Sequence, residues 1–557
     1  MKRLLALLLA VIMCFSLIAC DMLGNGGDQT DDDTNDDGTN NGGTNDDGNN
    51  DDGDDDKNDN TGDNTTPGGS TGGNDDNTGN EDDDTVTGPS KVTYSVPAEG
   101  YDGSEVTITF SHTMGEALRN ELDLAIERFN ELYPNITIEH TQVGGYDDVR
   151  DTIKQELTAG NQPNIAYCYP DHVALYNLTK KVVALDSFIE SEIIVTREDG
   201  STEILGLTED QINNYIDSYY EEGTVFDEAG TMYTLPMSKS TEVMYYNKTF
   251  FEKYNLQVPT TWDQLEAVCA RILEIQDELN AEITKKNANL PKDEQIPLYN
   301  WIPLGYDSEA NWFITMCEQY NSNYTSATGT KFLFNNKTNR EFVAKFRSWY
   351  DKGYVTTQEI FGGYTSDIFK DQTSFMSIGS SAGATHQRPA KGNDGKYPFE
   401  VGITSIPQVD AENNGKVISQ GPSLCILENT NRDEVMASWL FMKFLTTNVA
   451  FQADFGIASG YVPVIKSVAN DENYKKFLDK ADGGNGIAAL SAKVCLEQES
   501  FYYTSPAFNG SSTARDQVGA LLQKCFAIEG ADDAAIDAAI EKAFEESIAE
   551  CKYSVGQ

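Results

Sequence analysis

Three short apolar runs, VTITF at residues 106–110, ITI at 136–138 and IAYC at 165–168, decide the fold class of this chain. The two segments between them have the three-to-four-residue apolar repeat of amphipathic helices. Strands and helices that alternate at this spacing predict an α/β fold with parallel strands. The repeat runs through Leu118, Leu122, Ala125, Phe129 and Leu132 in the first segment, and through Val149, Ile153 and Leu157 in the second, which is predicted to end at Gly160.

The loops after these strands are the predicted position of a ligand site. In doubly wound sheets, ligands bind beyond the carboxyl ends of the strands. We therefore expect the loops at residues 111–115, 144–146 and 169–172 to line a pocket.

The chain beyond residue 90 is too long for one hydrophobic core and predicts two domains. A helix is predicted from Trp262, with a polar surface elaboration at 281–295. Further strands are predicted at 375–378, 401–406 and 423–427, and another helix at 435–445. We assign these elements to two discontinuous lobes joined by more than one crossover: a first lobe of residues 104–227 and 365–420, and a second of residues 228–364 and 421–557.

The N-terminus has the pattern of an export signal. Lys2 and Arg3 precede the apolar stretch from Leu4 to Ile18, which is short for a membrane span. Small residues before Cys20 resemble the bacterial lipobox, in which that cysteine is lipidated and becomes the first residue of the mature protein. The alternative is an ordinary cleaved signal with an incidental cysteine. We predict a signal peptide at 1–20 and lipid anchoring through Cys20 at the extracellular face of the cell membrane.

Composition predicts a disordered tether behind the anchor. Residues 21–90 hold 22 acidic residues, one lysine and very few apolar side chains, so they cannot bury enough surface to fold. We extend the predicted tether to residue 100. The net charge of −50 argues against nucleic acid as a partner.

The cysteines and histidines give no sign of a metal or cofactor site. The seven cysteines after Cys20 form no CxxC motif, and an odd number cannot be fully paired in disulfides. Most have apolar neighbours, which favours small buried side chains. The four histidines are not spaced as metal ligands. We expect no bound metal and no cofactor.

A series of short motifs follows the predicted strands. They are ERFNELYP (127–134), GGYDDV (144–149), TAGNQPNI (158–165), YTLPMSKSTEVMYYNKTFFEKYNL (233–256), VPTTWDQL (258–265), FKDQTSFMSIGSS (369–381), GITSIPQV (402–409), SQGPSLCIL (419–427), ASWLFMKFLTT (437–447) and ASGYVPV (458–464). Their order and spacing resemble the family 1 extracellular solute-binding proteins of bacterial ABC importers. The resemblance implies a type II periplasmic-binding-protein fold of two lobes, with the ligand in the cleft between them and a hinge that closes on it.

Two further motifs, FSHTMGEAL (110–118) and GSSTARDQV (510–518), are similar to the branch of this family that binds glycerol 3-phosphate. Arginine can hold a phosphate through two parallel hydrogen bonds, and serine hydroxyls and free N–H groups at a helix start complement an anion. The binding positions that the resemblance implies are Tyr146, Ser240, Ser380, Gly421, Tyr461 and Arg515. From the residues alone, Arg515 in the polar turn NGSSTAR is also compatible with a surface position.

The resemblance has two departures at the end of the site that binds hydroxyl groups. The family's acidic residue falls at or beside Pro170, where Asp171 is the available substitute. A tryptophan of the cleft has no clean counterpart: Trp312 matches its neighbour, and Tyr306 is the stand-in. His112 either contacts ligand or caps the first helix. An ordinary sugar therefore stays open as the ligand.

These features predict the ligand-capturing protein of an ABC importer, acting as a monomer with the permease subunits. The solute is glycerol 3-phosphate, a glycerophosphodiester or a saccharide. No nucleophile elbow, phosphate loop or metal cluster is present, so we expect no enzymatic activity. The alternatives are a surface lipoprotein without a role in transport, such as a glycan-binding adhesin, and a glycan-processing enzyme with two opposed carboxylates.

Overall fold

The computed structural model describes residues 90–557 except 327–330, 411–414 and 531. The predicted signal peptide, Cys20 and the tether up to residue 89 lie outside the described residues. Within the described ranges, no helix combines the length and the apolar character needed to cross a membrane.

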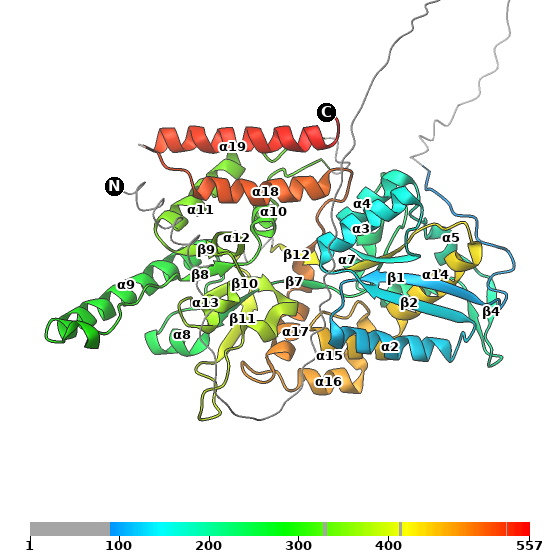
Figure 1. Ribbon diagram of the computed structural model, residues 1–557, viewed down its shortest axis with the longest axis horizontal. Helices are drawn as coiled ribbons and strands as arrows, with labels where there is room; N and C mark the ends of the chain where they lie inside the picture. Colours follow the sequence, from blue (N-terminus) through cyan, green and yellow to red (C-terminus); the bar gives the residue numbers. More distant parts are fainter. Residues whose placement is uncertain (1–89, 327–330, 411–414, 531) are drawn as a thin grey trace, which may run out of the picture. The chain divides into compact units, whose positions relative to one another are not determined.

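The first lobe is built on a sheet with strand order β2-β1-β3-β13-β6. Figure 1 shows two of its strands, β1 and β2, side by side. β1 pairs in parallel with β2 and β3, while β13 pairs antiparallel with β3 and β6. The three strands predicted at the start of the fold, and their parallel pairing, are confirmed. The strand bounds are β1 Val106–His112, β2 Ile136–Gln142, β3 Ile165–Cys168, β6 Leu235–Pro236 and β13 Ser423–Ile426.

The apolar repeats of the first lobe bury one face of each helix against this sheet. Leu122 and Phe129 of α2 (Glu116–Asn130) and Ile108 and Phe110 of β1 belong to one core. α3 (Tyr146–Ala159) ends at Gly160, as predicted, because the glycine takes the left-handed conformation that closes the last turn (φ 81°). α14 (Arg432–Thr447) and α15 (Val449–Ser459) complete this core.

The second lobe is built on a sheet with strand order β14-β12-β7-β10-β8-β9, with β11 also pairing with β7. α18 and α19 run side by side at one border of this lobe (Figure 1). Its core holds Trp312, Trp349 and Phe346. The elements are β7 Ser240–Asn247, β8 Leu304–Tyr306, β9 Val355–Thr357, β10 Met376–Ser380, β11 Val401–Ser405, β12 Val417–Gln420, β14 Tyr502–Tyr503, α10 Glu309–Gln319, α11 Lys337–Asp351, α18 Ser511–Phe526 and α19 Asp533–Ser554.

Apart from α9, the remaining helices and strands span eleven residues or fewer. α9 extends away from the second lobe (Figure 1), and the side chains of Asn280 and Asn287 bind the backbone of the returning segment, which agrees with the predicted elaboration. The bounds are α4 Pro170–Tyr176, α5 Asp186–Ile189, β4 Ile194–Thr196, β5 Thr202–Ile204, α6 Glu209–Asn214, α7 Asp217–Glu221, α8 Lys248–Tyr254, α9 Trp262–Asn287, α12 Gln358–Phe361, α13 Ser366–Lys370, α16 Glu472–Leu478 and α17 Ile487–Glu497.

The chain crosses between the sheets more than once, as expected for a hinge without a loose linker. It passes to the second sheet between β6 and β7, returns between β12 and β13, and enters the second sheet again at β14. The first two crossovers lie side by side, since Gln420 pairs with Ser240.

The sheet topology corrects the predicted lobe boundaries. The strands within 365–420, which are β10, β11 and β12, belong to the second sheet rather than the first, and β13 belongs to the first sheet rather than the second. A short apolar strand looks the same in either sheet, and only long-range pairing decides its partner.

The structure also places the start of the folded part before residue 101. Lys91 forms an ion pair with Asp186 at 2.7 Å, and the ring of Tyr94 stacks on Phe188 with centroids 5.3 Å apart. Tyr94 and Val96 pack against the first core. The predicted tether of residues 21–100 is therefore too long, because apolar side chains between 91 and 100 have a surface to cover.

Candidate ligand-binding cleft

A cavity of about 70 Å³ opens where the two lobes meet at the crossovers. The first lobe contributes the segment that follows β3, and the second lobe contributes the end of β12 and the segment before α18. Asp171, Gly421 and Arg515, three of the predicted binding residues, line it. The full lining is Tyr169, Pro170, Asp171, Glu222, Ile418, Ser419, Gln420, Gly421, Thr504, Ser505, Pro506, Ser511 and Arg515.

A cluster of tyrosines forms the wall on the side of the first lobe. The ring of Tyr169 stacks on Tyr146 with centroids 4.2 Å apart, and the hydroxyls of Tyr146 and Tyr461 are 3.3 Å apart. The predicted residues Tyr146 and Tyr461 therefore lie directly behind Tyr169. Burial raises the pKa of all three hydroxyls, so they remain neutral hydrogen-bond donors.

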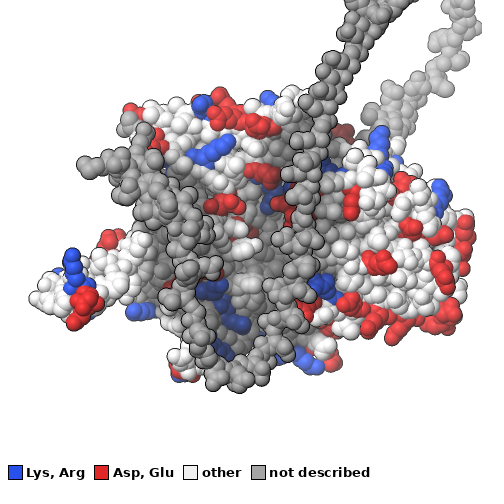
Figure 2. Space-filling view, viewed as in Figure 1, with Lys and Arg blue, Asp and Glu red and all other residues white. Residues whose placement is uncertain are grey.

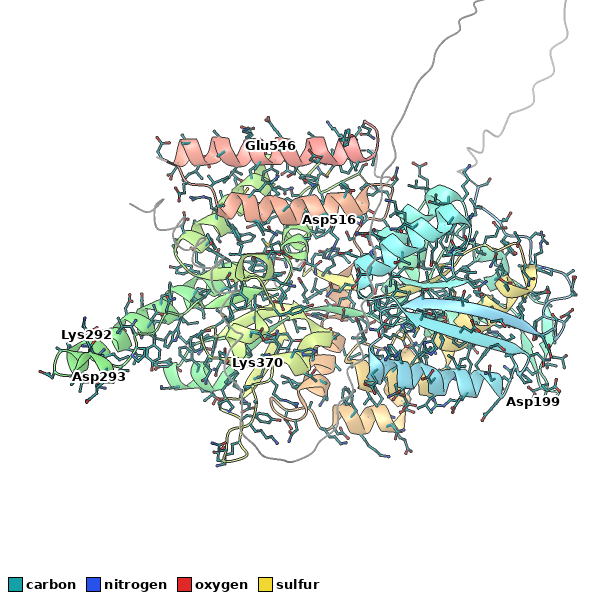
Figure 3. All side chains as sticks on the ribbon, in the orientation of Figure 1. Asp199, Lys292, Asp293, Lys370, Asp516 and Glu546 are labelled. Carbon is teal, nitrogen blue, oxygen red and sulfur yellow. The ribbon has the colours of Figure 1, made fainter. Side chains whose placement is uncertain are left out.

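Arg515 lies near the N-terminal end of α18 and lines the cavity. Its guanidinium donates to Oδ1 of Asn311, and in the described part of the chain it forms no ion pair. Figure 3 labels the next residue, Asp516, at the end of α18 that lies near α4 of the other lobe. The cavity thus presents an arginine with donors to spare, which is a binding group for carboxylates and phosphates.

Asn311 connects Arg515 to a buried carboxylate that sequence analysis did not identify. Its Nδ2 donates to Oε1 of Glu242 at 3.0 Å and to Oε1 of Gln420 at 2.9 Å. The hydroxyl of Tyr306 donates to Oε2 of Glu242 at 2.6 Å. The only sequence signal was an acidic residue in the strand STEVMYYN, whose other residues are uncharged.

A buried ion pair lies beneath the crossovers, and sequence analysis missed it as well. Lys239 and Glu222 are 0% and 1% exposed, and the Lys239 ammonium donates to the Glu222 carboxylate. The ammonium also donates to the backbone oxygen of Gly421 and to Oγ of Ser423, both at 3.0 Å. Three separate segments meet at this pair, and one of its members, Glu222, reaches the cavity.

Gly421 brings the two crossovers into close contact. Its φ is 107°, and a Cβ at this position would lie 2.8 Å from the backbone oxygen of Ser238 and 3.0 Å from the backbone nitrogen of Ser240. Only glycine combines this conformation with this approach. The predicted glycine therefore sets the packing of the hinge.

The two predicted serines do not line the cavity. Ser240 is buried in β7, beside Gly421 and opposite Gln420. The side chain of Ser380 accepts from the backbone nitrogen of Ala382 at 3.3 Å, at the start of the turn that follows β10. The structure places both at the ends of second-lobe strands, outside the cavity lining.

The structure does not bring His112 or Trp312 to the cavity. His112 is fully buried, with Nε2 2.9 Å from Nδ1 of His140, and its Nδ1 accepts from the backbone of Met114. Trp312 is fully buried and stacks on Tyr306 with centroids 4.8 Å apart. Both aromatic rings pack inside their lobes, where neighbouring side chains enclose them.

His112 is expected to make stability depend on pH. Burial, together with the charges of His140 and Arg119, lowers its pKa to about 4. The unfolded chain takes up this proton below pH 6.5 and the folded chain does not, so stability falls as the pH drops from 6.5 to 4, by up to about 3 kcal/mol. Urea unfolding should show a smaller loss over this range for His112→Asn, whose Oδ1 can still accept from Met114. Parallel pH profiles of the two proteins would contradict the assignment.

The described cysteines and possible metal ligands do not form a further site. The seven described cysteines are buried, as predicted, and unbridged, and Sγ of Cys168 lies 3.6 Å from Sγ of Cys425. Among the side chains that the structure describes, no three His, Cys, Asp or Glu residues are grouped as a metal ion requires. On the described surface, acidic side chains gather over the first lobe around α2 and β4 (Figure 2).

Comparison with known proteins agrees with this architecture. The family model for bacterial extracellular solute-binding proteins matches residues 125–479. The sn-glycerol-3-phosphate-binding periplasmic protein UgpB of Escherichia coli K12 is 24% identical over 391 residues, which cover 68% of this chain and 79% of that protein. UgpB of Shigella dysenteriae gives the same identity and coverage.

Solved structures of solute-binding proteins share the fold. The cyclic alpha-maltosyl-1,6-maltose binding protein of Arthrobacter globiformis has a TM-score of 0.58 at 17% identity, covering 80% of this chain and 99% of that one. UgpB of Mycobacterium tuberculosis in complex with glycerophosphocholine has a TM-score of 0.56 at 16% identity, covering 81% and 99%. The fold is that of the type II periplasmic binding proteins, and the chain belongs to the family of bacterial extracellular solute-binding proteins.

Proposed function

We propose that this protein is the lipid-anchored substrate-binding component of an ABC importer. It captures a carbohydrate-class solute, either glycerol 3-phosphate, a glycerophosphodiester or a sugar, in the cleft between its lobes and delivers it to the membrane permease. The observation that carries the proposal is the cavity at the crossovers, with an arginine on one side and stacked tyrosines on the other. A ligand held there contacts both lobes and favours their closure.

The chemistry of the cavity supports a ligand with an anionic end and a hydroxyl-bearing end. Arg515 supplies charge and parallel donors for a phosphate. Asp171, at the other side, is an acceptor for hydroxyl groups, and the ring of Tyr169 provides a flat surface for carbon atoms. Glycerol 3-phosphate, named for UgpB of Escherichia coli, and glycerophosphocholine, bound to UgpB of Mycobacterium tuberculosis, each carry a phosphate group and hydroxyl groups.

A role in binding rather than catalysis fits the distribution of charges. Of the two carboxylates that line the cavity, Glu222 is bound to Lys239, which leaves Asp171 without an opposed partner. Glycoside hydrolysis requires two free carboxyl groups across the scissile bond. We therefore favour the solute-binding role over a glycan-processing enzyme.

A thermal-shift screen tests the proposal. The panel contains glycerol 3-phosphate, glycerophosphocholine, maltose and a set of monosaccharides, with inorganic phosphate and glycerol as controls. A ligand that binds the folded state at 100 times its Kd adds about 2.7 kcal/mol of stability, which shifts Tm measurably. Tm values that stay unchanged across the phosphate esters and sugars would contradict a carbohydrate-class ligand.

Cys20→Ala is expected to release the protein from membranes. The lipid on this cysteine is the strong hydrophobic anchor that the sequence predicts, and two acyl chains suffice for stable attachment. The measurement is the distribution of wild-type and variant protein between membrane and soluble fractions after a salt wash. A variant that remains with the washed membranes would show that the anchor lies elsewhere.

A further inference from the structure

Glu242 is a buried carboxylate that contacts the binding machinery without reaching the cavity. It is 1% exposed on β7, and both its carboxylate oxygens accept a hydrogen bond, one from the Tyr306 hydroxyl and one from Nδ2 of Asn311. Its own backbone oxygen accepts from Nε2 of Gln498. Two hydrogen bonds therefore hold the carboxylate, and a third holds the backbone of the same residue.

The contact with Asn311 determines which way that amide points. An ionised carboxylate accepts hydrogen bonds, so it holds Nδ2 of Asn311 toward itself and leaves Oδ1 facing Arg515. Gln420 reinforces this orientation, because its Oε1 also accepts from Nδ2 at 2.9 Å. The side chain of Arg515 is thus held at the cavity by an acceptor that Glu242 and Gln420 orient.

The charge of Glu242 also acts on Arg515. Burial raises the pKa of this carboxyl to about 7, while the hydrogen bonds from Tyr306 and Asn311 and the charge of Arg515 lower it, and Asp307 raises it. The hydroxyl of Tyr503, whose own pKa is raised by burial, is the other titratable group that interacts with it. Glu242 consequently changes charge near neutral pH, within reach of the arginine that faces the cavity.

We propose that Glu242 is a positioning residue that sets, through Asn311, how strongly Arg515 binds an anionic ligand, and that anion binding is accompanied by proton uptake at Glu242. The proposal rests on the proposed function. The ionised carboxylate keeps the Asn311 oxygen on the guanidinium and adds its own negative charge nearby, so it competes with the ligand for Arg515. The protonated form lacks this charge. By linkage, an anion near Arg515 favours protonation of Glu242 to the same extent.

The test uses glycerophosphocholine, whose phosphodiester keeps its charge between pH 6 and pH 8. Calorimetry in buffers of different ionisation enthalpy measures both Kd and the number of protons taken up. For the wild type we expect proton uptake and an affinity up to about tenfold higher at pH 6 than at pH 8. Tenfold is the limit over this range for one coupled group with a pKa of about 7. Glu242→Gln, which is similar in size and does not titrate, should bind with no proton uptake and no pH dependence.

Two further measurements separate this role from a structural one. Tyr306→Phe removes a hydrogen bond that lowers the pKa of Glu242, so the midpoint of the affinity profile should move to higher pH. Without ligand, the folded carboxyl holds its proton more tightly than the unfolded one. Wild-type stability should therefore decline relative to Glu242→Gln as the pH rises from about 4.5 through 7.

The outcomes distinguish the inference from the proposed function. Binding of glycerophosphocholine by the wild type without proton uptake, or with the same pH profile as Glu242→Gln, overturns the inference and leaves the transport role standing. A wild type that binds only neutral sugars also overturns the inference and leaves the transport role standing. A wild type that binds nothing in the panel overturns the proposed function, and with it the inference.

Discussion

Arg515→Ala is expected to weaken the binding of glycerol 3-phosphate by tens-fold to thousands-fold. The guanidinium lines the cavity and forms no ion pair in the described part of the chain, so a bound phosphate is its natural counter-charge. Without it, part of the phosphate charge is left unpaired in a partly desolvated cleft, which costs about 2–5 kcal/mol. Isothermal titration calorimetry on the two proteins measures the difference directly.

The same variant separates a phosphate ligand from a neutral sugar. For a sugar, the change removes one or two hydrogen bonds to uncharged hydroxyls, each about 0.5–1.5 kcal/mol, while stacking on the tyrosines persists. Arg388→Ala is the matched control, because Arg388 binds the backbone of Gly484 and does not line the cavity. A wild type that binds a sugar at micromolar Kd but shows no glycerol 3-phosphate binding would exclude the phosphate assignment.

Lys239→Met is expected to lower the free energy of unfolding by about 3–5 kcal/mol. The ammonium is fully buried and satisfies the Glu222 carboxylate, the backbone oxygen of Gly421 and the hydroxyl of Ser423. Its removal leaves a buried carboxylate uncompensated at the point where the crossovers meet. Urea unfolding of the wild type and of Lys239→Met at neutral pH, both without ligand, measures this difference.

A second substitution tests whether charge is the cause. In Lys239→Met/Glu222→Gln the uncompensated charge is gone, so part of the lost stability should return. Lys248→Met is the control, since Lys248 forms an ion pair with Glu400 on the exposed surface, where such pairs contribute little. Equal losses for Lys239→Met and the double variant would point to lost packing rather than to charge.

Local patterns were sufficient to predict much of the fold. The strands at 106–110, 136–138 and 165–168 and the helices between them follow from apolar spacing over a few residues, and each forms as predicted. The same holds for the end of α3 at Gly160, where conformation is decided by one residue. What failed was the assignment of 365–420 to the first lobe, because strand pairing depends on residues far away in the sequence.

Some of the predicted binding residues lie at the cavity, and others do not. Gly421 and Arg515, which the motifs implied, line the cavity together with Asp171, the substitute for the family's acidic residue, and Tyr146 and Tyr461 lie behind it. His112 and Trp312 occupy equally suggestive positions in the sequence, and the surrounding core encloses them. Exposure to a cavity depends on neighbours from several elements, which no single motif contains.

The sequence by itself determined the two-lobed α/β fold, the family and the arginine of the cleft, because these follow from local periodicity and from motifs in a fixed order. The tertiary structure alone decided the two polar networks behind the cleft. Glu242 and Arg515 come together through Asn311, and Lys239 meets Glu222 beneath Gly421. Each network joins side chains from separate segments of the chain, and a buried charge acquires its partners only when those segments pack.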